Sequence, residues 1–144
     1  MIVGQILKSK ADMGVVSVKP TDTVTAAVAL LSQNRIGTVV VSSDGQTLDG
    51  ILSERDIVRE LGKRGVSCLM APVSEMMTSK LTTCTTADSA DQVLEMMTEG
   101  RFRHLPVMDN GKMIGLISIG DVVKARLSEL SMEKDALAGM IMGH

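Results

Sequence analysis

A seven-residue phrase occurs twice in this chain. It reads GILSERD where it ends at Asp56 and GLISIGD where it ends at Asp121, so the two copies are 65 positions apart. Further upstream, Asp22 and Asp88 are 66 positions apart, and the register therefore extends through the preceding sequence with a change of one residue. Internal repeats of this kind indicate consecutive copies of one structural unit. We interpret the 144-residue chain as two copies of one small α/β unit.

A helix is predicted at the same place in each copy. Over 23–34 the apolar residues follow the spacing i, i+3, i+4, i+7 that places side chains on one face of a helix. These residues are Val24, Ala27, Val28 and Leu31, and the positions 66 residues later are Ala90, Val93, Leu94 and Met97. The repeat is therefore structural as well as textual.

Each copy is predicted to have the order strand, helix, strand, strand, helix, which is an α/β (α+β) fold. The expected elements of the first copy are strand 15–18, helix 23–34, strands 38–42 and 48–53, and helix 54–64. In the second copy, strands 105–108 and 113–118 precede a helix over 119–130. Asp44-Gly45 and Asn110-Gly111 indicate the hairpin turns.

The segments that lead into the two copies also correspond. VGQILKSK, from Val3 to Lys10, is similar to VSEMMTSK, from Val73 to Lys80. We place the first repeat at 3–65, the second at 72–131 and a C-terminal tail at 132–144. The tail contains Leu137, Met140 and Ile141. It is interpreted either as a helical cap over the core or as a contact with a second subunit, and both alternatives stay open.

Composition and charge limit the classes of function. A net charge of −2 and a pI near 5.6 provide no long-range field for a polyanion, which argues against nucleic acid as the main partner. Apolar runs are too short to span a bilayer and the first residues do not resemble a secretory signal, so we expect a cytoplasmic protein without a membrane partner. Cys68 and Cys84 lack metal-site or redox spacing and are expected to be free, largely buried thiols, with no metal required.

Both copies contain Ser-x-x-Asp at the junction between a strand and a helix. In the simpler interpretation, Ser53 or Ser118 caps the helix while Asp56 or Asp121 returns a hydrogen bond to the cap. In the alternative, the carboxylate accepts hydrogen bonds from the two hydroxyls of a ribose, and the helix start favours phosphate. The two roles are compatible.

At these residues the chain resembles a tandem pair of cystathionine β-synthase (CBS) domains, also called a Bateman module, as found in stand-alone bacterial proteins. GILSERDIVREL and RFRHLPVMDNGKMIGLISIGDVVKARL carry the resemblance, which covers about 3–130. It implies a pseudo-twofold module with two clefts between the repeats. Such clefts bind adenosine-containing ligands: AMP, ADP, ATP, NAD(H) or S-adenosylmethionine.

The resemblance also implies roles for residues. Asp56 and Asp121 would hold ribose hydroxyls, with Ser53 and Ser118 beside them. Adenine would lie against the backbone of the first strand of each repeat, which contains Val16, Ser17 and Val18 or Thr82, Thr83 and Cys84. It would also contact the apolar side chains of Ile36 and Phe102. Phosphate would meet a segment that differs between the copies, with Arg35, Gly37 and Thr38 in the first and Arg101, Arg103 and His104 in the second. Pro106 is also placed in the nucleotide site.

The family tends to pair the aspartate of one repeat with this segment of the other. The Asp56 cleft would then receive Arg103 and His104, with Arg55 as a second guanidinium, and would be the better anion site. The structural alternatives are that Arg103 is solvated, His104 satisfies a local hydrogen bond and Phe102 belongs to the core.

We therefore expect a non-catalytic regulatory module that binds adenine nucleotides or NAD(H), forms a homodimer and signals to an unknown partner protein. A ligand-free interaction module is the first alternative. An enzyme is the second, for example by analogy with inosine monophosphate dehydrogenase, which contains such pairs. The chain lacks the length for that enzyme's barrel, and its only histidines are His104 and His144.

Overall fold

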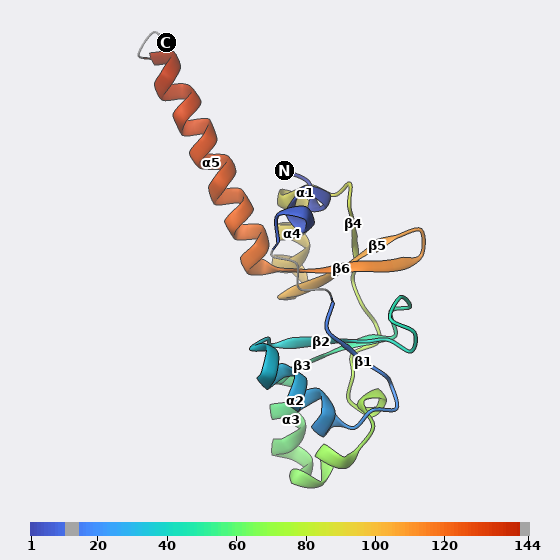
Figure 1. The fold of residues 1–144 in the computed structure, drawn as a ribbon. Helices are drawn as coiled ribbons and strands as arrows, with labels where there is room; N and C mark the ends of the chain where they lie inside the picture. The colour runs from blue at the N-terminus through green and yellow to red at the C-terminus, as the bar shows by residue number, and fades with distance from the viewer. Residues whose placement is uncertain (11–14, 142–144) are drawn as a thin grey trace. The chain divides into compact units, whose positions relative to one another are not determined.

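The computed structural model describes residues 1–10 and 15–141, which form two compact units (Figure 1). One unit, called here the second-repeat unit, contains the described residues 1–10, 83–108 and 115–141. The other, called the first-repeat unit, contains the described residues 15–82 and 109–114. The predicted α/β fold and its duplication are confirmed.

The first-repeat unit is built on a three-stranded sheet. Strands β1 (Ser17–Val18), β2 (Thr38–Val41) and β3 (Gly50–Ser53) lie in that order, with β1 parallel and β3 antiparallel to β2. All four residues of β2 are buried, as expected for the central strand. Helices α2 (Val24–Asn34) and α3 (Glu54–Arg64) and the short 3-10 helices η1 (Val66–Met70) and η2 (Val73–Glu75) complete the unit.

The second-repeat unit repeats this arrangement. Its sheet has the order β4 (Cys84–Thr85), β5 (His104–Asp109) and β6 (Lys112–Ser118), with β4 parallel to β5. Residues 109–114, around the hairpin turn, are grouped with the first-repeat unit. Helices α1 (Val3–Ser9), α4 (Ala90–Gly100) and α5 (Ile119–Ile141) belong to the same unit. Between β5 and β6, Asn110 and Gly111 both have positive φ, as the Asn-Gly hairpin signal predicts.

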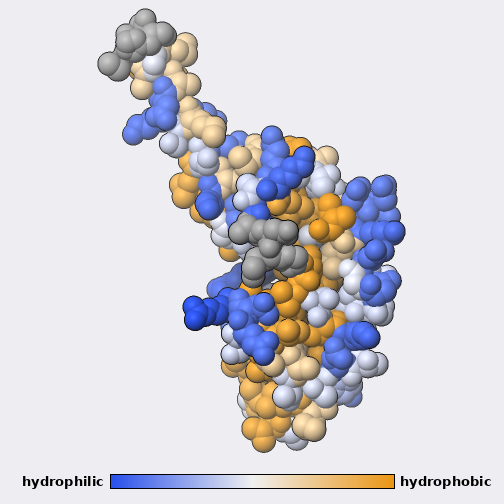
Figure 2. Space-filling view, in the orientation of Figure 1, coloured by the Kyte–Doolittle hydropathy of each residue, from blue (hydrophilic) through white to orange (hydrophobic). Residues whose placement is uncertain are grey.

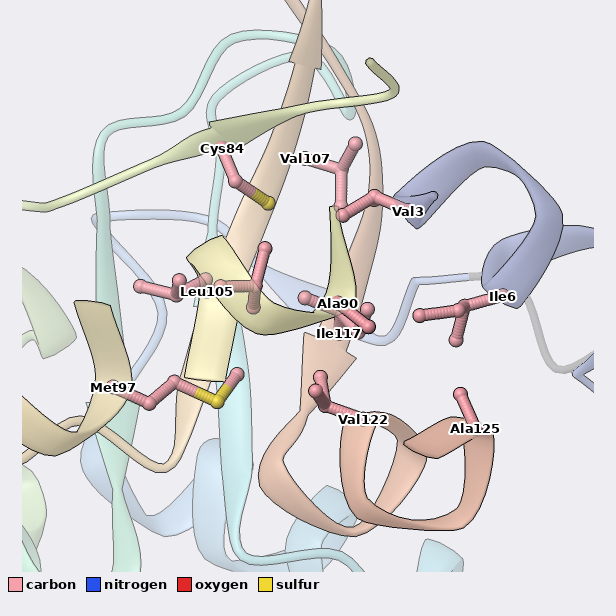
Figure 3. Close-up of a cluster of buried hydrophobic side chains, with 11 residues drawn as sticks. Val3, Ile6, Cys84, Ala90, Met97, Leu105, Val107, Ile117, Val122 and Ala125 are labelled. Carbon is pink, nitrogen blue, oxygen red and sulfur yellow. The ribbon is translucent and has the colours of Figure 1, made fainter. Parts of the chain in front are cut away.

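Each unit is completed by the lead-in segment of the other repeat. Val3 and Ile6 of α1 are buried in the core of the second-repeat unit, together with Ile117, Val122 and other residues (Figure 3). In the first-repeat unit the corresponding positions are taken by Val73 and Met76, which follow that repeat in the sequence. The lead-ins are therefore exchanged between the two cores.

The first glycine of the duplicated phrase accommodates this exchange. A Cβ on Gly50 would lie 2.8 Å from the Met77 Sδ atom, and a Cβ on Gly115 would lie 2.9 Å from Cδ2 of Leu7. In the first-repeat unit the lead-in also pairs with β3, since the amides and carbonyls of Ile51 and Thr78 bond to each other. Glycine recurs at this position because the exchanged segment crosses it.

Both cysteines are buried, as the sequence predicts. Cys68 lies in the first-repeat core and Cys84 in the second. Burial, followed by the negative charge of Asp88, raises the pKa of Cys84 to about 11. The thiol of Cys84 is therefore protonated at neutral pH and packs as a small apolar group.

The expected end of the last helix near Leu130 is wrong. Helix α5 continues without a break to Ile141 and extends away from α1 and α4 (Figure 1). From Ser131 to Ile141 every residue except the half-buried Gly139 is exposed, so this part of the helix covers no core. Among the described residues, no helix is long and apolar enough to cross a bilayer.

Helices α2 and α4 end in the same way. Their C-terminal arginines, Arg35 and Arg101, have left-handed φ values of 53° and 57°. The next amide bonds back to the helix, from Ile36 to the Leu31 carbonyl and from Phe102 to that of Met97. This Schellman arrangement returns an apolar side chain to the core, where Ile36 and Phe102 are half-buried.

Replacement of two glycines tests this helix end. An added Cβ on Gly100 would overlap the ring of Phe102, so Gly100→Ala is expected to destabilise the protein by about 1–3 kcal/mol. Gly62 in α3 has no atom within 4 Å of an added Cβ, so Gly62→Ala should instead stabilise by about 0.5–1 kcal/mol. Urea denaturation measures both changes, and a stabilising Gly100→Ala would contradict this account of Phe102.

Candidate functional site

The β6–α5 junction holds Ser118 and Asp121 in a reciprocal cap. The Ser118 amide donates to Oδ2 of Asp121 at 2.9 Å, and the Asp121 amide donates to Oγ of Ser118 at 3.1 Å. This is the capping geometry that the Ser-x-x-Asp pattern predicts. The cap uses only Oδ2, and among the described residues no hydrogen bond to Oδ1 is recorded.

Lys10, from the exchanged lead-in, also contacts Asp121. Its Nζ atom lies 2.8 Å from Oδ2 of Asp121 and donates to the Leu116 carbonyl at 2.9 Å. The Asp121 side chain keeps 24% of its surface exposed. Burial raises the pKa of Asp121, but hydrogen bonds from Lys10 and Ser118 outweigh it, so the pKa is lowered and the carboxylate is charged at neutral pH.

His104, at the start of β5, belongs to the same cluster. Its pKa is lowered mainly by burial and also by the positive charges of Lys10 and Arg103, while Asp121 acts in the opposite direction. His104 is therefore neutral at pH 7. Because the folded-state pKa lies below the usual 6.5, its contribution to stability is present above about pH 6.5 and is lost as the pH falls.

Arg103 brings a second cation to the start of α5. Its carbonyl accepts a hydrogen bond of 2.9 Å from the Ile119 amide, which fixes the backbone beside the helix start, and its side chain is exposed. The second-repeat unit thus brings together one carboxylate, two cations and a neutral imidazole. We call Lys10, Arg103, His104 and Asp121 the α5 cluster.

The equivalent junction of the first-repeat unit is more completely satisfied. The amide and hydroxyl of Ser53 both donate to Oδ2 of Asp56 at 3.0 Å, and Nη2 of Arg59 donates to Oδ1 at 2.9 Å. Asp56 is only 8% exposed. Both of its oxygens are therefore used by residues of its own helix and cap. The neighbouring Arg55 is exposed.

The other predicted site residues are divided between the two units. The first-repeat unit contains Val16, Ser17, Val18, Ile36, Gly37, Thr38 and Thr82, and the second-repeat unit contains Thr83, Cys84, Arg101, Phe102 and Pro106. Val18 and Cys84 point into their cores, and Phe102 packs against its core. Core packing thus accounts for these three side chains, and their contact with adenine stays a prediction.

Lys10 is the site residue that the sequence analysis missed. It contacts Asp121 across 111 positions of sequence, which no local pattern reveals. The available signal was the pair of lead-ins, because Lys10 and Lys80 end the two similar segments. The predicted pairing of Asp56 with Arg103 and His104 joins residues of different units and stays a prediction.

Comparison with known proteins identifies the family. The model of the CBS domain matches twice, at residues 3–63 and 73–128. The chain belongs to the CBS-domain family. It is 36% identical to the mitochondrial CBS domain-containing protein CBSX3 of Arabidopsis thaliana, over 98% of this chain and 72% of that protein.

Solved CBS-domain structures share the fold. The CBS-domain protein ATU1752 of Agrobacterium tumefaciens is 41% identical, with a TM-score of 0.82 over 88% of this chain and 99% of that chain. CBSX2 of Arabidopsis thaliana, solved in complex with AMP, is 29% identical, with a TM-score of 0.74 over 88% of this chain and 96% of that chain. The predicted tandem CBS pair is thereby confirmed.

The Lys10→Met variant tests the α5 cluster. Loss of the ammonium removes the hydrogen bond that it donates to Asp121 and the positive charge that it places near His104. The pKa of both groups is therefore expected to rise. NMR titration of the Asp121 carboxyl and the His104 ring measures both values. Lys8→Met removes an equal charge from an exposed position on α1 and should leave both unchanged. Equal shifts in the two variants would contradict the specific contact.

Proposed function

We propose that this CBS pair is a non-catalytic regulatory module that binds adenosine-containing ligands, namely AMP, ADP, ATP or NAD(H). The observation that carries the proposal is the α5 cluster. An ionised carboxylate with one oxygen outside its cap lies beside two cations at the start of a helix. Ribose offers paired hydroxyl donors and phosphate offers negative charge, and the cluster contains groups complementary to both.

Asp121 is the proposed ribose ligand. Its Oδ1 atom can accept a ribose hydroxyl while Oδ2 keeps its bond to the Ser118 amide, so binding does not require the helix cap to break. Hydrogen bonds to a charged carboxylate are stronger than those between neutral groups. The capping and binding interpretations of the Ser-x-x-Asp pattern are therefore compatible at this position.

The phosphate group would be held by the cations of the cluster. Arg103 is exposed at the helix start and can bind phosphate with two parallel hydrogen bonds. Lys10 supplies a point charge and is already held by Asp121 and the Leu116 carbonyl. His104 is neutral at pH 7 because its pKa is lowered, so its proposed role is that of a hydrogen-bonding group.

The AMP complex of CBSX2 supports the class of ligand, since that protein has the same fold and is 29% identical to this chain. The proposed module acts in the cytoplasm as a homodimer and reports the bound ligand to a partner protein. Ligand binding would shift the population of two conformations by no more than the difference in its affinity for them.

A ligand-free interaction module is the second candidate. It is favoured by Asp56, whose two oxygens are both occupied within the first-repeat unit. Thermal denaturation with each adenosine ligand separates the candidates, because a ligand at a hundred times its Kd adds about 2.7 kcal/mol of stability. Absence of a shift with every such ligand would favour the ligand-free module.

The Asp121→Asn variant tests the ribose assignment. Asparagine retains an oxygen for the Ser118 amide but loses the charge, so the fold should persist while adenosine and AMP both bind at least about tenfold more weakly. Isothermal titration calorimetry measures the affinities. Asp135→Asn makes the same change at an exposed position of α5 and should have no effect. Unchanged affinity in Asp121→Asn would remove Asp121 from the site.

The Arg103→Ala variant tests the phosphate assignment. Its carbonyl still accepts from Ile119, so the backbone contact is kept while the guanidinium is lost. AMP affinity is expected to fall by about tenfold or more, and adenosine affinity by much less, because only AMP carries the phosphate. An equal loss for both ligands would reject the role of Arg103 in phosphate binding.

A further inference from the structure

Helix α5 carries an apolar stripe that no other part of the described chain covers. Its positions alternate by four and three residues along the helix, which is the spacing of coiled-coil seams. The residues are Val123, Leu127, Leu130, Lys134, Leu137 and Ile141, of which only Lys134 is polar. Leu127, Leu137 and Ile141 are 63%, 59% and 84% exposed. We call these six positions the α5 seam.

The α5 seam is distinct from the face by which α5 packs on its own unit. That face contributes Val122 and Ala125 to the core and pairs Arg126 with Asp91 of α4 at 2.9 Å. With 100° between successive residues, the seam lies about 100° around the helix from this face. The core of the unit therefore leaves the seam available.

Among the described residues, no side chain of α5 beyond Glu129 forms a hydrogen bond or an ion pair with another element. The extending part shows apolar and polar residues interleaved on its surface (Figure 2). Isolated helices shorter than about 12–15 residues are marginal in water, and most helical stability comes from packing. A helix that continues to Ile141 with large apolar side chains exposed is therefore expected to have a packing partner.

We propose that the partner is a second copy of this chain, whose α5 seam packs against the first in a two-helix coiled coil. A seam repeating every 3.5 residues is complementary to a helix with the same repeat, and a second α5 provides it. A two-fold axis buries the same surface on both copies and closes the assembly at a dimer. The periodicity of the seam and the two-fold closure thus both favour a second α5 as its occupant.

The position of Lys134 favours an antiparallel dimer. In a parallel, in-register pair, Lys134 of one helix would lie opposite Lys134 of the other, and the two positive charges would repel each other. An antiparallel register centred on Met132 pairs every seam position with another, which gives Val123 with Ile141, Leu127 with Leu137 and Leu130 with Lys134. A single lysine in a seam is known to specify pairing at a cost in stability.

This inference rests on one part of the proposed function, the expected homodimer. Nucleotide binding can succeed or fail independently of the α5 dimer. The seam spans fewer than three heptads, so the dimer should depend on protein concentration. Analytical ultracentrifugation of the full chain over a range of concentrations measures the dimer dissociation constant. AMP thermal shifts on the same samples report the proposed nucleotide site separately.

Leu137→Glu is the first test. A charge in the seam is expected to weaken the dimer at least tenfold, whereas Ser128→Glu, an equal charge on another exposed face of α5, should not. Circular dichroism verifies that the variant is folded. A wild-type chain that is monomeric at every concentration would overturn the proposal, as would a dimer that survives Leu137→Glu.

Lys134→Ile is the second test, and it predicts a gain. Removing the polar seam position should tighten the dimer at least tenfold, while Lys124→Ile, at an exposed position outside the seam, should have little effect. Equal tightening by both variants would indicate non-specific association and overturn the proposal. So would a monomeric wild-type chain that sediments with phosphatidylserine vesicles, because a lipid surface would then be the occupant.

Discussion

The exchange of lead-in segments is the constraint on which both units depend. Val3 and Ile6 complete the core that contains α4 and α5, and Val73 and Met76 complete the core that contains α2 and α3. The same exchange accounts for Gly50 and Gly115, since a side chain at either position would collide with the crossing segment. It also delivers Lys10 to Asp121. Packing and electrostatics at the second helix junction thus have a common origin.

The two junctions show how one sequence pattern yields unequal sites. Both aspartates cap their helices, but the second oxygen of Asp56 accepts a hydrogen bond from Arg59. The counterpart of Arg59 in α5 is Lys124, which forms no ion pair within the described chain. Asp121 is contacted instead by Lys10 on the oxygen that already serves the cap. The proposed ligand role therefore rests more firmly on Asp121 than on Asp56, although the repeat makes them equivalent in sequence.

Local signals predicted those features that local interactions determine. Helix α3 has the predicted bounds because Ser53 caps its start and Gly65, with a positive φ, ends it. The expected end of α5 near Leu130 was too early because helix-forming residues, with no proline among them, continue beyond it. Lys10 was missed because its contact depends on the exchange of lead-ins, which the similarity between the two segments indicates without revealing which core each one joins.

The exchanged lead-ins have a consequence for the origin of the chain. A shorter ancestral polypeptide with one repeat would have carried a leading segment and a groove to receive it. If it packed as the two units do here, the segment of each molecule would have completed the core of another, and the folded species would have contained two identical chains. Gene fusion would then have preserved an existing intermolecular contact within one polypeptide, leaving each sequence to diverge, as Asp56 and Asp121 have done in their surroundings.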